Sequence, residues 1–343
     1  MYISDAIIKN FSCFSQIELN NLNTNINVIT GREGIGKSRL LTALSIPLAG
    51  IIKRRVYSNL TFNTNFIKSG ESESNIQLTL KGSLFDSIYT VESIRNYTKS
   101  HTKYNSNDDT SLWDKFAYNK HHDINIEFID MSDFTSEFYT DKTPNRHMMS
   151  FMNLCCRINR IENESSNQLL KDAIHQKLNF ALNNFLPNID SVEIIYPNKD
   201  LFMDVEIKFK KRLRGNVVEV LQFSQLSRSE RCLVLFIMNF ISKYDVSTLY
   251  YHPIINSNNI IFINNIENNI HPSYMYNLYD NLQLIFPETQ FFITTTDPFL
   301  ISNCLNDELI YLDYDLSGNR CRTDCELHGS DVNTISSYLC NYN

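Results

Sequence analysis

Apolar and polar residues alternate with a period of two over much of the first hundred residues, the pattern of strands that are buried on one face. This alternation predicts strands over residues 2–8, 15–19, 26–30, 74–80 and 87–92. After the third of these, a turn rich in glycine leads into the run Ser38 to Leu44, whose apolar residues have helical spacing. The chain therefore opens with strands, a glycine-rich loop and a helix.

The middle of the chain has a different pattern. From about residue 96 to residue 123 it is polar, which predicts a long surface loop or a partly ordered insertion. Residues 148–185 then have helical periodicity and an apolar stripe that is typical of core packing. The stripe consists of Leu169, Leu170, Ile174, Leu178 and Leu182.

Strands and helices alternate again in the last part of the chain. Strands are predicted over residues 192–196, 202–209, 217–221, 260–263 and 291–295. Helices are predicted over residues 232–241 and 272–284, shortly after Pro298, and over 332–339, with a strand and hairpin before the last one. Alternating strands and helices at both ends, around a helical and loop-rich middle, predict an α/β fold that carries an insertion.

One short segment carries recognisable chemistry. Residues Gly31-Arg32-Glu33-Gly34-Ile35-Gly36-Lys37-Ser38 fit the pattern G-x4-G-K-[ST], between a predicted strand and a predicted helix. Glycines let the backbone wrap a phosphate, and amide N–H groups with the helix N-terminus supply positive potential. In this pattern Lys37 reaches the β- and γ-phosphates and Ser38 takes a position on Mg²⁺. The alternative is an ordinary glycine-rich turn between a strand and a helix.

Further stretches extend the pattern in a fixed order along the chain. They are Ile7 to Phe14, Ile26 to Ile29 before the phosphate loop, Leu226 to Arg231, Ile260 to Glu267 with His271-Pro272, and Phe292 to Pro298. With these motifs the chain resembles the RecF/SMC-type ABC ATPases, while roughly residues 95–190 remain unmatched. The resemblance implies an α/β P-loop NTPase fold of ABC type with an antiparallel β subdomain and a helical, loop-rich insertion.

The resemblance also implies a division of the chain and a set of ligand-binding residues. Residues 1–94 are expected to form the N-terminal half of an ATPase head with Walker A, 95–190 the insertion, and 191–343 the C-terminal half. The implied cofactors are ATP and Mg²⁺, with Ser38 on the metal. The implied nucleotide-binding residues are Gly31, Gly34, Ile35, Gly36, Lys37, Ser38, Arg39, Ser227, Ser229 and Glu230.

The chain departs from the pattern at the positions that support hydrolysis. Asn264 stands where the pattern has the Walker B Asp, Asn265 replaces the adjacent catalytic Glu, and Thr296 replaces the switch His. The signature Gly is Ser229. An amide has nearly the shape of a carboxylate but lacks its charge and basicity, and general-base help is worth ~10²–10⁴-fold. We expect slow or absent hydrolysis, with Glu267 as the one carboxylate nearby that could replace the lost groups.

Near the C-terminus, Leu327 to Ile335 is similar to a segment that recurs in the OLD-like and Septu-type (PtuA) ATPases of bacterial phage defence. The sequence after this segment is too short for the TOPRIM nuclease domain that OLD proteins append. This second resemblance implies that any nuclease effector is a separate polypeptide.

Charge and composition narrow the choice further. The net charge of −7 over 343 residues gives no global basic field of the kind that marks nucleic-acid binding. The sequence shows no apolar stretch of about 20 residues and no evident signal peptide, so we expect a cytosolic protein that does not bind membranes. The eight cysteines lack the paired spacing of a zinc site and are expected to be reduced.

Three functional hypotheses remain open. The first is an ATP-binding, hydrolysis-poor subunit that dimerises through nucleotide, as a homo-oligomer or with a related ATPase, and holds or gates a separate nuclease in an anti-phage complex. The second is an active RecF-like ATPase of DNA repair or DNA-end recognition, with DNA as partner; it is favoured by the basic runs at 53–55 and 210–214. The third is an interaction module that has lost nucleotide.

Overall fold

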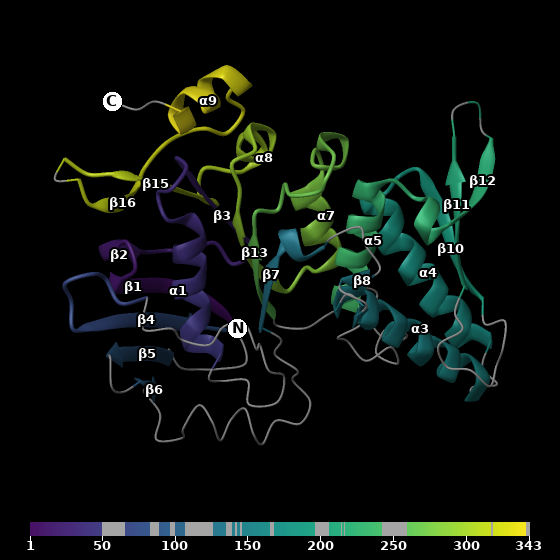
Figure 1. Ribbon diagram of the computed structural model, residues 1–343, viewed down its shortest axis with the longest axis horizontal. Helices are drawn as coiled ribbons and strands as arrows, with labels where there is room; N and C mark the ends of the chain where they lie inside the picture. Colours follow the sequence, from purple (N-terminus) through teal and green to yellow (C-terminus); the bar gives the residue numbers. More distant parts are fainter. Residues whose placement is uncertain are drawn as a thin grey trace. The chain divides into compact units, whose positions relative to one another are not determined.

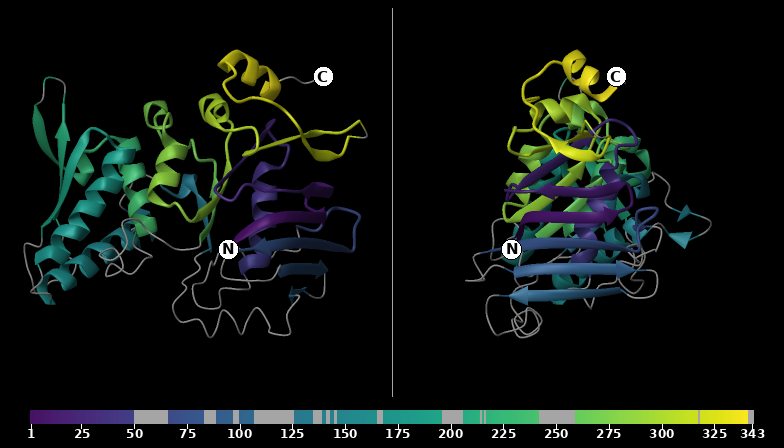
Figure 2. Two further views of the ribbon diagram at one scale, coloured as in Figure 1. Left: turned by 180° about the vertical axis from the view of Figure 1, so that it is seen from behind. Right: turned by 90° about the vertical axis from the view of Figure 1, so that its left-hand side faces the viewer.

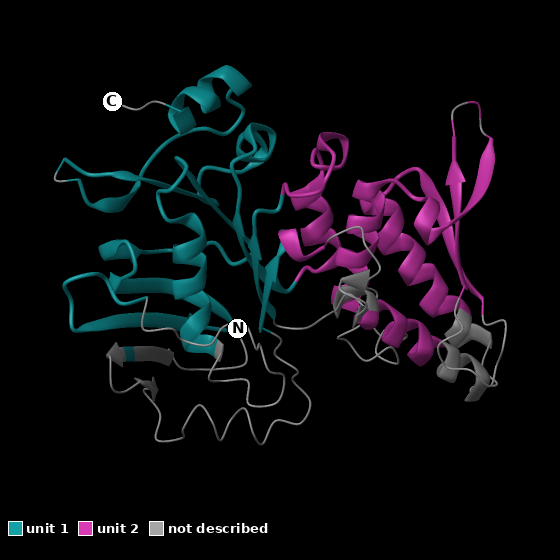
Figure 3. Cartoon of the chain, viewed as in Figure 1, with its two compact units in different colours: residues 1–131, 257–266, 288–343 teal, residues 132–256, 267–287 magenta. Residues whose placement is uncertain are grey.

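The computed structural model describes most of the chain, and the fold is given for those residues. They are 1–49, 66–82, 89–96, 100–106, 126–134, 139–140, 143–144, 146–164, 168–195, 206–213, 215, 217–241, 259–316 and 318–340. The chain forms two compact units (Figure 3). Unit 1 consists of residues 1–131, 257–266 and 288–343, and unit 2 consists of residues 132–256 and 267–287.

Unit 1 contains a six-stranded sheet in the order β16-β15-β3-β14-β13-β7. Its strands are β3 (Ile26–Gly31), β7 (Ile126–Asp130), β13 (Asn259–Asn264), β14 (Thr289–Thr294), β15 (Leu309–Tyr314) and β16 (Arg320–Thr323). All neighbours are parallel except β16, which is antiparallel to β15. Every residue of β3, β13 and β14 is buried, which is typical of parallel strands that are covered on both faces of their sheet.

A second sheet of unit 1 is antiparallel and has the order β2-β1-β4-β5-β6. Its strands are β1 (Tyr2–Phe11), β2 (Phe14–Leu19), β4 (Glu73–Lys81), β5 (Tyr89–Asn96) and β6 (Ser100–Ser106). Helix α1 (Lys37–Ala49) packs against strands of both sheets (Figures 1 and 2). The leucines of this helix share one apolar core with those strands. Two shorter helices, α8 (Pro298–Asn303) and α9 (Val332–Cys340), pack together near the end of the chain.

Unit 2 combines helices with a small antiparallel sheet of order β10-β11-β12. The helices are α3 (Arg146–Glu164), α4 (Gln168–Phe185), α5 (Arg228–Ile241) and α7 (Leu278–Ile285), with 3₁₀ turns η3 (Phe223–Gln225) and η4 (Pro272–Tyr274). The strands are β10 (Ile189–Ile195), β11 (Glu206–Arg212) and β12 (Val218–Gln222), with a separate pair β8 (Tyr139–Thr140) and β9 (Thr143–Pro144). The turn η2 (Met131–Asp133) lies at the boundary of the two units.

The core of unit 2 is centred on helix α5. Residues 232–241 of this helix are all buried, although a helix that faces solvent on one side is normally buried along only one stripe. The ring of Phe236 contacts Phe134, Phe185 and Phe240, with ring centroids 6.0, 6.5 and 4.8 Å away, all in edge-on geometry. These aromatic contacts pack the middle and the end of α5 into the core of unit 2.

The structure confirms most of the predicted strands and helices and corrects three details. Residues 100–106, which were predicted to be loop, form strand β6, and residues 126–130 form a strand that the sequence reading did not predict. The single helix predicted over 272–284 is divided into η4 and α7. In the predicted stripe of α4, Ile174, Leu178 and Leu182 are buried, as expected for core packing.

All eight cysteines are free, as predicted, and burial raises the pKa of Cys155 and Cys232 to about 12, so these thiols stay protonated. Among the described helices, none has the length and apolar character needed to cross a bilayer.

Candidate functional site

The phosphate loop predicted from the sequence connects the buried strand β3 to helix α1 in unit 1. Gly31 ends the strand with φ +135°, and a Cβ atom there would lie 2.3 Å from the carbonyl oxygen of Leu312 on the neighbouring strand β15. Gly36 precedes the helix with φ +111°, and a Cβ there would lie 2.6 Å from Sγ of Cys13. Only glycine fits at either position, so the loop is held close to the strands on both sides.

The cation of the loop is placed at its centre. Lys37 Nζ donates hydrogen bonds to the carbonyl oxygens of Gly31 and Arg32, at 2.8 and 2.9 Å. The ammonium group is therefore held inside the loop, where a phosphate would offer charged acceptors in place of neutral carbonyls and so form stronger hydrogen bonds. The first turn of α1 contains no acidic residue that would compete with an anion for the helix N-terminus.

The other predicted residues of the loop divide into exposed and anchoring groups. Gly34 is exposed, whereas the side chain of Ile35 is fully buried and fixes the loop in the core. The guanidinium of Arg39 lies over the ring of Phe66, 5.2 Å from its centroid. Ser38 is partly exposed at the start of the helix. Ser38 supplies a hydroxyl oxygen, and the glycines leave space beside the loop that a Cβ atom would fill. The loop therefore fits ATP with Mg²⁺.

The degenerate Walker B position lies at the carboxyl end of β13, two strands from β3 in the sheet. Asn264 is 6% exposed, and its Oδ1 accepts a hydrogen bond from Thr294 Oγ1 at 2.9 Å. Its Nδ2 donates to Asp130 Oδ2 at 2.7 Å. Both the oxygen and the nitrogen of this amide are therefore hydrogen-bonded to residues of neighbouring strands. Sequence reasoning identified Asn264 and missed Thr294 and Asp130.

The position of the catalytic glutamate has a backbone constraint as well as a changed side chain. Asn265 has φ +51°, in the left-handed region, which Asn adopts more readily than most residues other than glycine. Its N–H donates to Thr294 Oγ1 at 2.8 Å, so the conformation is fixed by a buried hydroxyl. An asparagine therefore suits this site for a structural reason, independent of its inability to act as a base.

The switch-like segment follows β14 at the same edge of the sheet. Thr296 is exposed, one residue after the fully buried Thr295. Asp297 starts helix α8, where its carboxylate accepts the N–H groups of Phe299 and Leu300 at 2.9 and 3.1 Å. The loop, Asn264, Asn265 and Thr296 consequently all belong to the carboxyl edge of one parallel sheet, the edge at which α/β folds bind their ligands.

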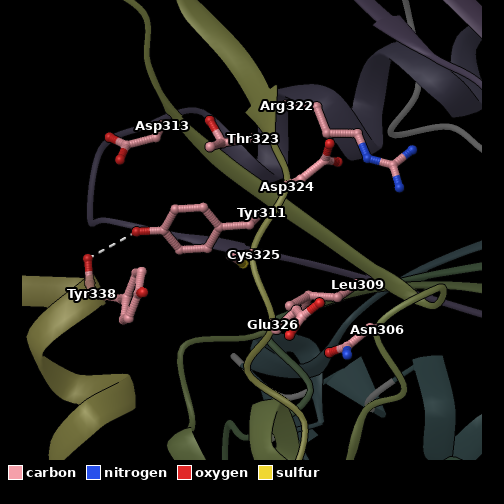
Figure 4. A pocket seen from close by; sticks show the side chains of 10 residues that line it. All are labelled: Asn306, Leu309, Tyr311, Asp313, Arg322, Thr323, Asp324, Cys325, Glu326 and Tyr338. Atoms are coloured by element: carbon pink, nitrogen blue, oxygen red, sulfur yellow. Dashed lines mark hydrogen bonds between the residues drawn. The ribbon is translucent and has the colours of Figure 1, made fainter.

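A pocket of about 550 Å³ lies next to the phosphate loop strand, between the hairpin of β15 and β16 and helix α9 (Figure 4). Tyr311 lines it and donates to the carbonyl of Tyr338 at 2.9 Å. Burial and then the carboxylate of Asp313 raise the pKa of Tyr311 to about 12. Asp313 also lies 3.6 Å from Nε of Arg32, which connects the wall of the pocket to the phosphate loop.

The signature-like segment lies in unit 2, at the start of helix α5. Ser227 Oγ accepts from the N–H of Glu230 at 3.4 Å, and Glu230 Oε2 accepts from the N–H of Ser227 at 2.8 Å. This reciprocal pair is a capping box, so the Ser-x-x-Glu spacing has a structural cause. Ser227 is exposed, Ser229 is half-buried and Glu230 is 2% exposed. Ser227 and Ser229 thus remain at the surface, whereas Glu230 faces the interior.

The buried carboxylate of Glu230 has two further partners. Lys211 Nζ on β11 lies 2.7 Å from its Oε1, and the hydroxyl of Tyr274 donates to the same oxygen at 3.3 Å. Burial alone would raise the pKa of Glu230, but the hydrogen bonds from Lys211 and Ser227 outweigh it and hold the pKa below its usual range. Lys211 belongs to the basic run 210–214, and its charge is used inside the unit.

The two remaining predicted positions also lie in unit 2. Glu267 is partly buried, and its carbonyl accepts from the N–H of Ile270 at 3.2 Å. His271 is the N-cap of η4, and its Nδ1 accepts the N–H of Ser273 at 3.2 Å. Phe11 and Phe14, which belong to the first of the matched stretches, are fully buried core residues.

A scan against models of known families finds no match. Among curated proteins, the chain is 36% identical over 80 residues to human structural maintenance of chromosomes protein 6, a stretch that covers 23% of this chain and 7% of that protein. The chain therefore spans only a small part of the length of that relative.

Solved structures match over almost the whole chain. An SMC head bound to the C-winged helix domain of ScpA has a TM-score of 0.65 at 14% identity, over 95% of this chain and 99% of that one. An SMC head with an extended coiled coil from Pyrococcus furiosus, bound to the C-terminal domain of ScpA, gives 0.60 at 12% identity, over 95% and 96%. The SMC head domain from Thermotoga maritima gives 0.55 at 14%, over 95% and 100%.

The chain has the fold of an SMC-type ABC ATPase head. This confirms the predicted fold class. Nothing in the sequence marked Thr294 or Lys211 beyond their positions on a strand, because their roles depend on which residues the neighbouring elements bring beside them.

Proposed function

We propose that the chain is an ATP-binding ABC-type subunit that hydrolyses ATP slowly and acts through the bound nucleotide. One contrast carries this proposal. The phosphate loop is complete, with Lys37 held by Gly31 and Arg32, while the positions of the hydrolytic carboxylates hold the amides Asn264 and Asn265. Binding is supported by charge and backbone geometry, whereas water activation lacks its base.

The rate consequence follows from the lost base and the lost charge. A positioned general base contributes ~10²–10⁴-fold to such reactions, and Asn265 has no basic atom to replace it. Its left-handed backbone, fixed by Thr294, also favours Asn over a longer side chain there. We therefore expect the nucleotide-bound state to be long-lived.

Nucleotide-dependent pairing is the second part of the proposal. In ABC ATPases the nucleotide lies between the phosphate loop of one protomer and the signature segment of the other. This chain carries both parts, and Ser227 at the start of α5 is exposed while its neighbour Glu230 is buried. A partner's γ-phosphate would meet the exposed Ser227 hydroxyl at this helix start. The partner is a second copy or a related ATPase.

The effector is the third part, and it is supported by a sequence resemblance rather than by geometry. The segment Leu327 to Ile335, similar to one in ATPases of phage defence, leads into helix α9 and includes its first residues. Asp331 caps this helix by accepting the N–H groups of Asn333 and Thr334 at 2.9 and 3.1 Å. We propose that the assembled subunit holds or gates a separate nuclease in an anti-phage complex.

The alternative function, an active RecF-like ATPase that binds DNA, relied on two basic runs. The run 53–55 lies outside the described residues, as does Arg214 of the other run. Of the rest, Lys211 pairs with Glu230, and Arg212 lies 2.8 Å from Asp190. Because these two cations are paired within the unit, the second run offers less free charge to DNA than its sequence indicates.

The first experiment measures binding of a fluorescent ATP analogue with Mg²⁺ and follows phosphate release in the same sample. We expect binding without appreciable turnover, and Lys37→Ala should weaken binding roughly 10- to 100-fold through loss of charge-assisted contacts. Lys9→Ala, which removes an exposed lysine of strand β1 outside the loop, is the matched control and should bind nearly normally.

Each other outcome has a clear meaning. Turnover at the rate of ordinary ATPases would contradict the hydrolysis-poor subunit and favour the RecF-like alternative. An absence of binding by the native chain would overturn both proposals and leave the interaction module. A molecular mass that doubles with ATP, and does not double in Lys37→Ala, would support nucleotide-dependent pairing.

A further inference from the structure

The edge strand β7 carries a carboxylate beside the degenerate Walker B position. Strands β7 and β13 are parallel neighbours (Figure 1), and their register places Asp130 directly beside Asn264. Both residues end their strands, so both lie at the carboxyl edge that also carries the phosphate loop. The charge that position 264 lacks is therefore present one strand away.

The two side chains lie on the face of the sheet that helix α1 covers. Successive residues of a strand point to opposite faces, so Asn264 shares a face with Phe262, and Asp130 shares one with Phe128. Phe262 belongs to the core that contains the leucines of α1, and Phe128 packs against that core. Because α1 begins with Lys37 and Ser38, the carboxylate and the start of this helix are on one side of one sheet.

The hydrogen bonds fix which atom of the amide faces the carboxylate. Ionised Asp130 can only accept, so the donor Nδ2 of Asn264 must face it, as it does at 2.7 Å. The Oδ1 atom then faces Thr294, whose hydroxyl donates to it at 2.9 Å. Thr294 in turn accepts the N–H of Asn265. The chain of bonds has one direction, in which the amide at 264 accepts from Thr294 and donates to the carboxylate at 130.

A carboxylate at both positions would be unfavourable. Two such groups at hydrogen-bond distance cannot both be ionised near neutral pH without a strong rise in one pKa. Asn264 and Asp130 are therefore a matched pair, in which one strand carries the amide and the other the charge. Position 264 by itself indicates that a carboxylate has been lost. The pair indicates that the carboxylate is instead on the next strand, at position 130.

We propose that Asp130 is the carboxylate of the nucleotide site and that it binds, directly or through water, the divalent cation that accompanies ATP. The inference rests on the proposed function, since it concerns the same site. Oxygen ligands from a carboxylate and from the Ser38 hydroxyl are those that Mg²⁺ prefers, and such sites commonly use one or two carboxylates together with substrate phosphates. Asn264 is then a positioning residue that orients Asp130.

The test compares binding of the fluorescent ATP analogue in Mg²⁺ and in EDTA. In the native chain Mg²⁺ should tighten binding, and Asp130→Asn should lose that gain, roughly 10- to 100-fold, while its affinity in EDTA stays unchanged. The substituted amide can still accept from Asn264, so the hydrogen bond survives and only the charge is removed. The double variant Asp130→Asn/Asn264→Asp exchanges the two groups and should regain most of the Mg²⁺ effect.

A matched control removes the same charge from a similar pair. Asp307 accepts from Asn23 Nδ2 at 3.1 Å, away from the carboxyl edge, so Asp307→Asn should leave the Mg²⁺ effect intact. A second readout needs no nucleotide. Asn264→Asp alone should lower the thermal unfolding temperature at neutral pH and regain it at acidic pH, where one carboxyl is protonated. The exchanged double variant should unfold near the native temperature at neutral pH.

The outcomes separate this inference from the proposed function. If the native chain binds the analogue and Asp130→Asn keeps the full Mg²⁺ effect, Asp130 is not the metal-binding carboxylate and the inference is wrong. If the native chain binds no nucleotide in either condition, the proposed function itself fails. A thermal unfolding temperature of Asn264→Asp that does not depend on pH would contradict the charge pairing.

Discussion

Helices α1 and α5 both begin at segments that the sequence marks as nucleotide-binding, yet their N-termini are built in opposite ways. The start of α1 follows a glycine loop, has no acidic residue in its first turn and is filled by Lys37. The start of α5 is closed by its own Glu230, which caps Ser227 and pairs with Lys211. One helix start keeps its full positive potential for a ligand, whereas at the other a carboxylate of the same unit offsets part of that potential and the exposed Ser227 hydroxyl remains for a ligand.

The two ion pairs beside these helix starts differ in the same way. Lys211 and Glu230 are 2.7 Å apart with side chains 20% and 2% exposed, whereas Arg32 and Asp313 are 3.6 Å apart and 20% and 25% exposed. Removing one partner of a buried pair strongly lowers the stability of the fold, because it leaves a buried charge without compensation. A partly exposed pair contributes less, because water solvates its charges when the pair is broken. The comparison predicts three effects of decreasing size.

The largest effect is expected at the closed helix start. Glu230→Ala removes the capping box and leaves the Lys211 ammonium beside a buried gap, so the free energy of unfolding should fall by about 3 kcal/mol. Chemical denaturation monitored by circular dichroism measures it. The double variant Glu230→Gln/Lys211→Met removes both charges and should recover much of the loss. Equal loss in both variants would show that the pair's charge is unimportant.

The pH dependence of the native chain checks the same carboxylate. Because the folded pKa of Glu230 is depressed, its contribution is present above the ordinary carboxyl pKa and is lost as pH falls through the folded value. This acid-induced loss should be smaller in Glu230→Gln than in the native chain.

A smaller effect is expected at the open helix start. Gly31→Ala places a Cβ 2.3 Å from the Leu312 carbonyl at φ +135°, which should cost about 2 kcal/mol of stability and weaken ATP binding by distorting the loop. Gly34→Ala is the control. Its φ is +74° but no atom lies within 4 Å of the added Cβ, so about 1 kcal/mol is expected. Thermal unfolding with and without the ATP analogue separates the two effects.

The smallest effect is expected where the phosphate loop meets the pocket. Asp313→Asn removes the partner of Arg32, and because both groups are partly exposed, stability should fall by only ~0.5 kcal/mol. A double-mutant cycle with Arg32→Gln isolates the pair. A coupling energy as large as that of Lys211 with Glu230 would show that Arg32 and Asp313 are shielded from water to the same degree as the buried pair. The contrast between the two ion pairs would then be wrong.

Sequence patterns predicted the strands and helices wherever one element supplied its own signal. Strand β13 contains the apolar run Ile260 to Ile263, and helix α5 contains a longer one, so their type was clear. Strand β7 has only five residues, includes Glu127, and borders polar sequence, so nothing local marks it as a strand. It exists because β13 pairs with it in parallel, and Glu127 is nevertheless buried there.

The candidate site was predictable to a similar degree. The loop residues follow from a contiguous motif, and the Ser-x-x-Glu spacing at Ser227 and Glu230 could have been read as a capping box from the sequence alone. The roles of Lys211 and Asp130 could not, because each partner lies far away in the chain. Lys211 is part of a basic run that reads as a solvated or DNA-binding face, and only the fold brings it to Glu230.

The position of β3 in its sheet also sets the order in which the protein is assembled. Both neighbours of this strand come from the far end of the chain: Val28 pairs with Ile293 on β14 and with Leu309 on β15. During synthesis the first residues emerge early, but the strand that carries the phosphate loop has no partner until these later residues are made. Such distant pairings slow folding. Acquisition of ATP binding would therefore report that translation has passed the last strands of the sheet.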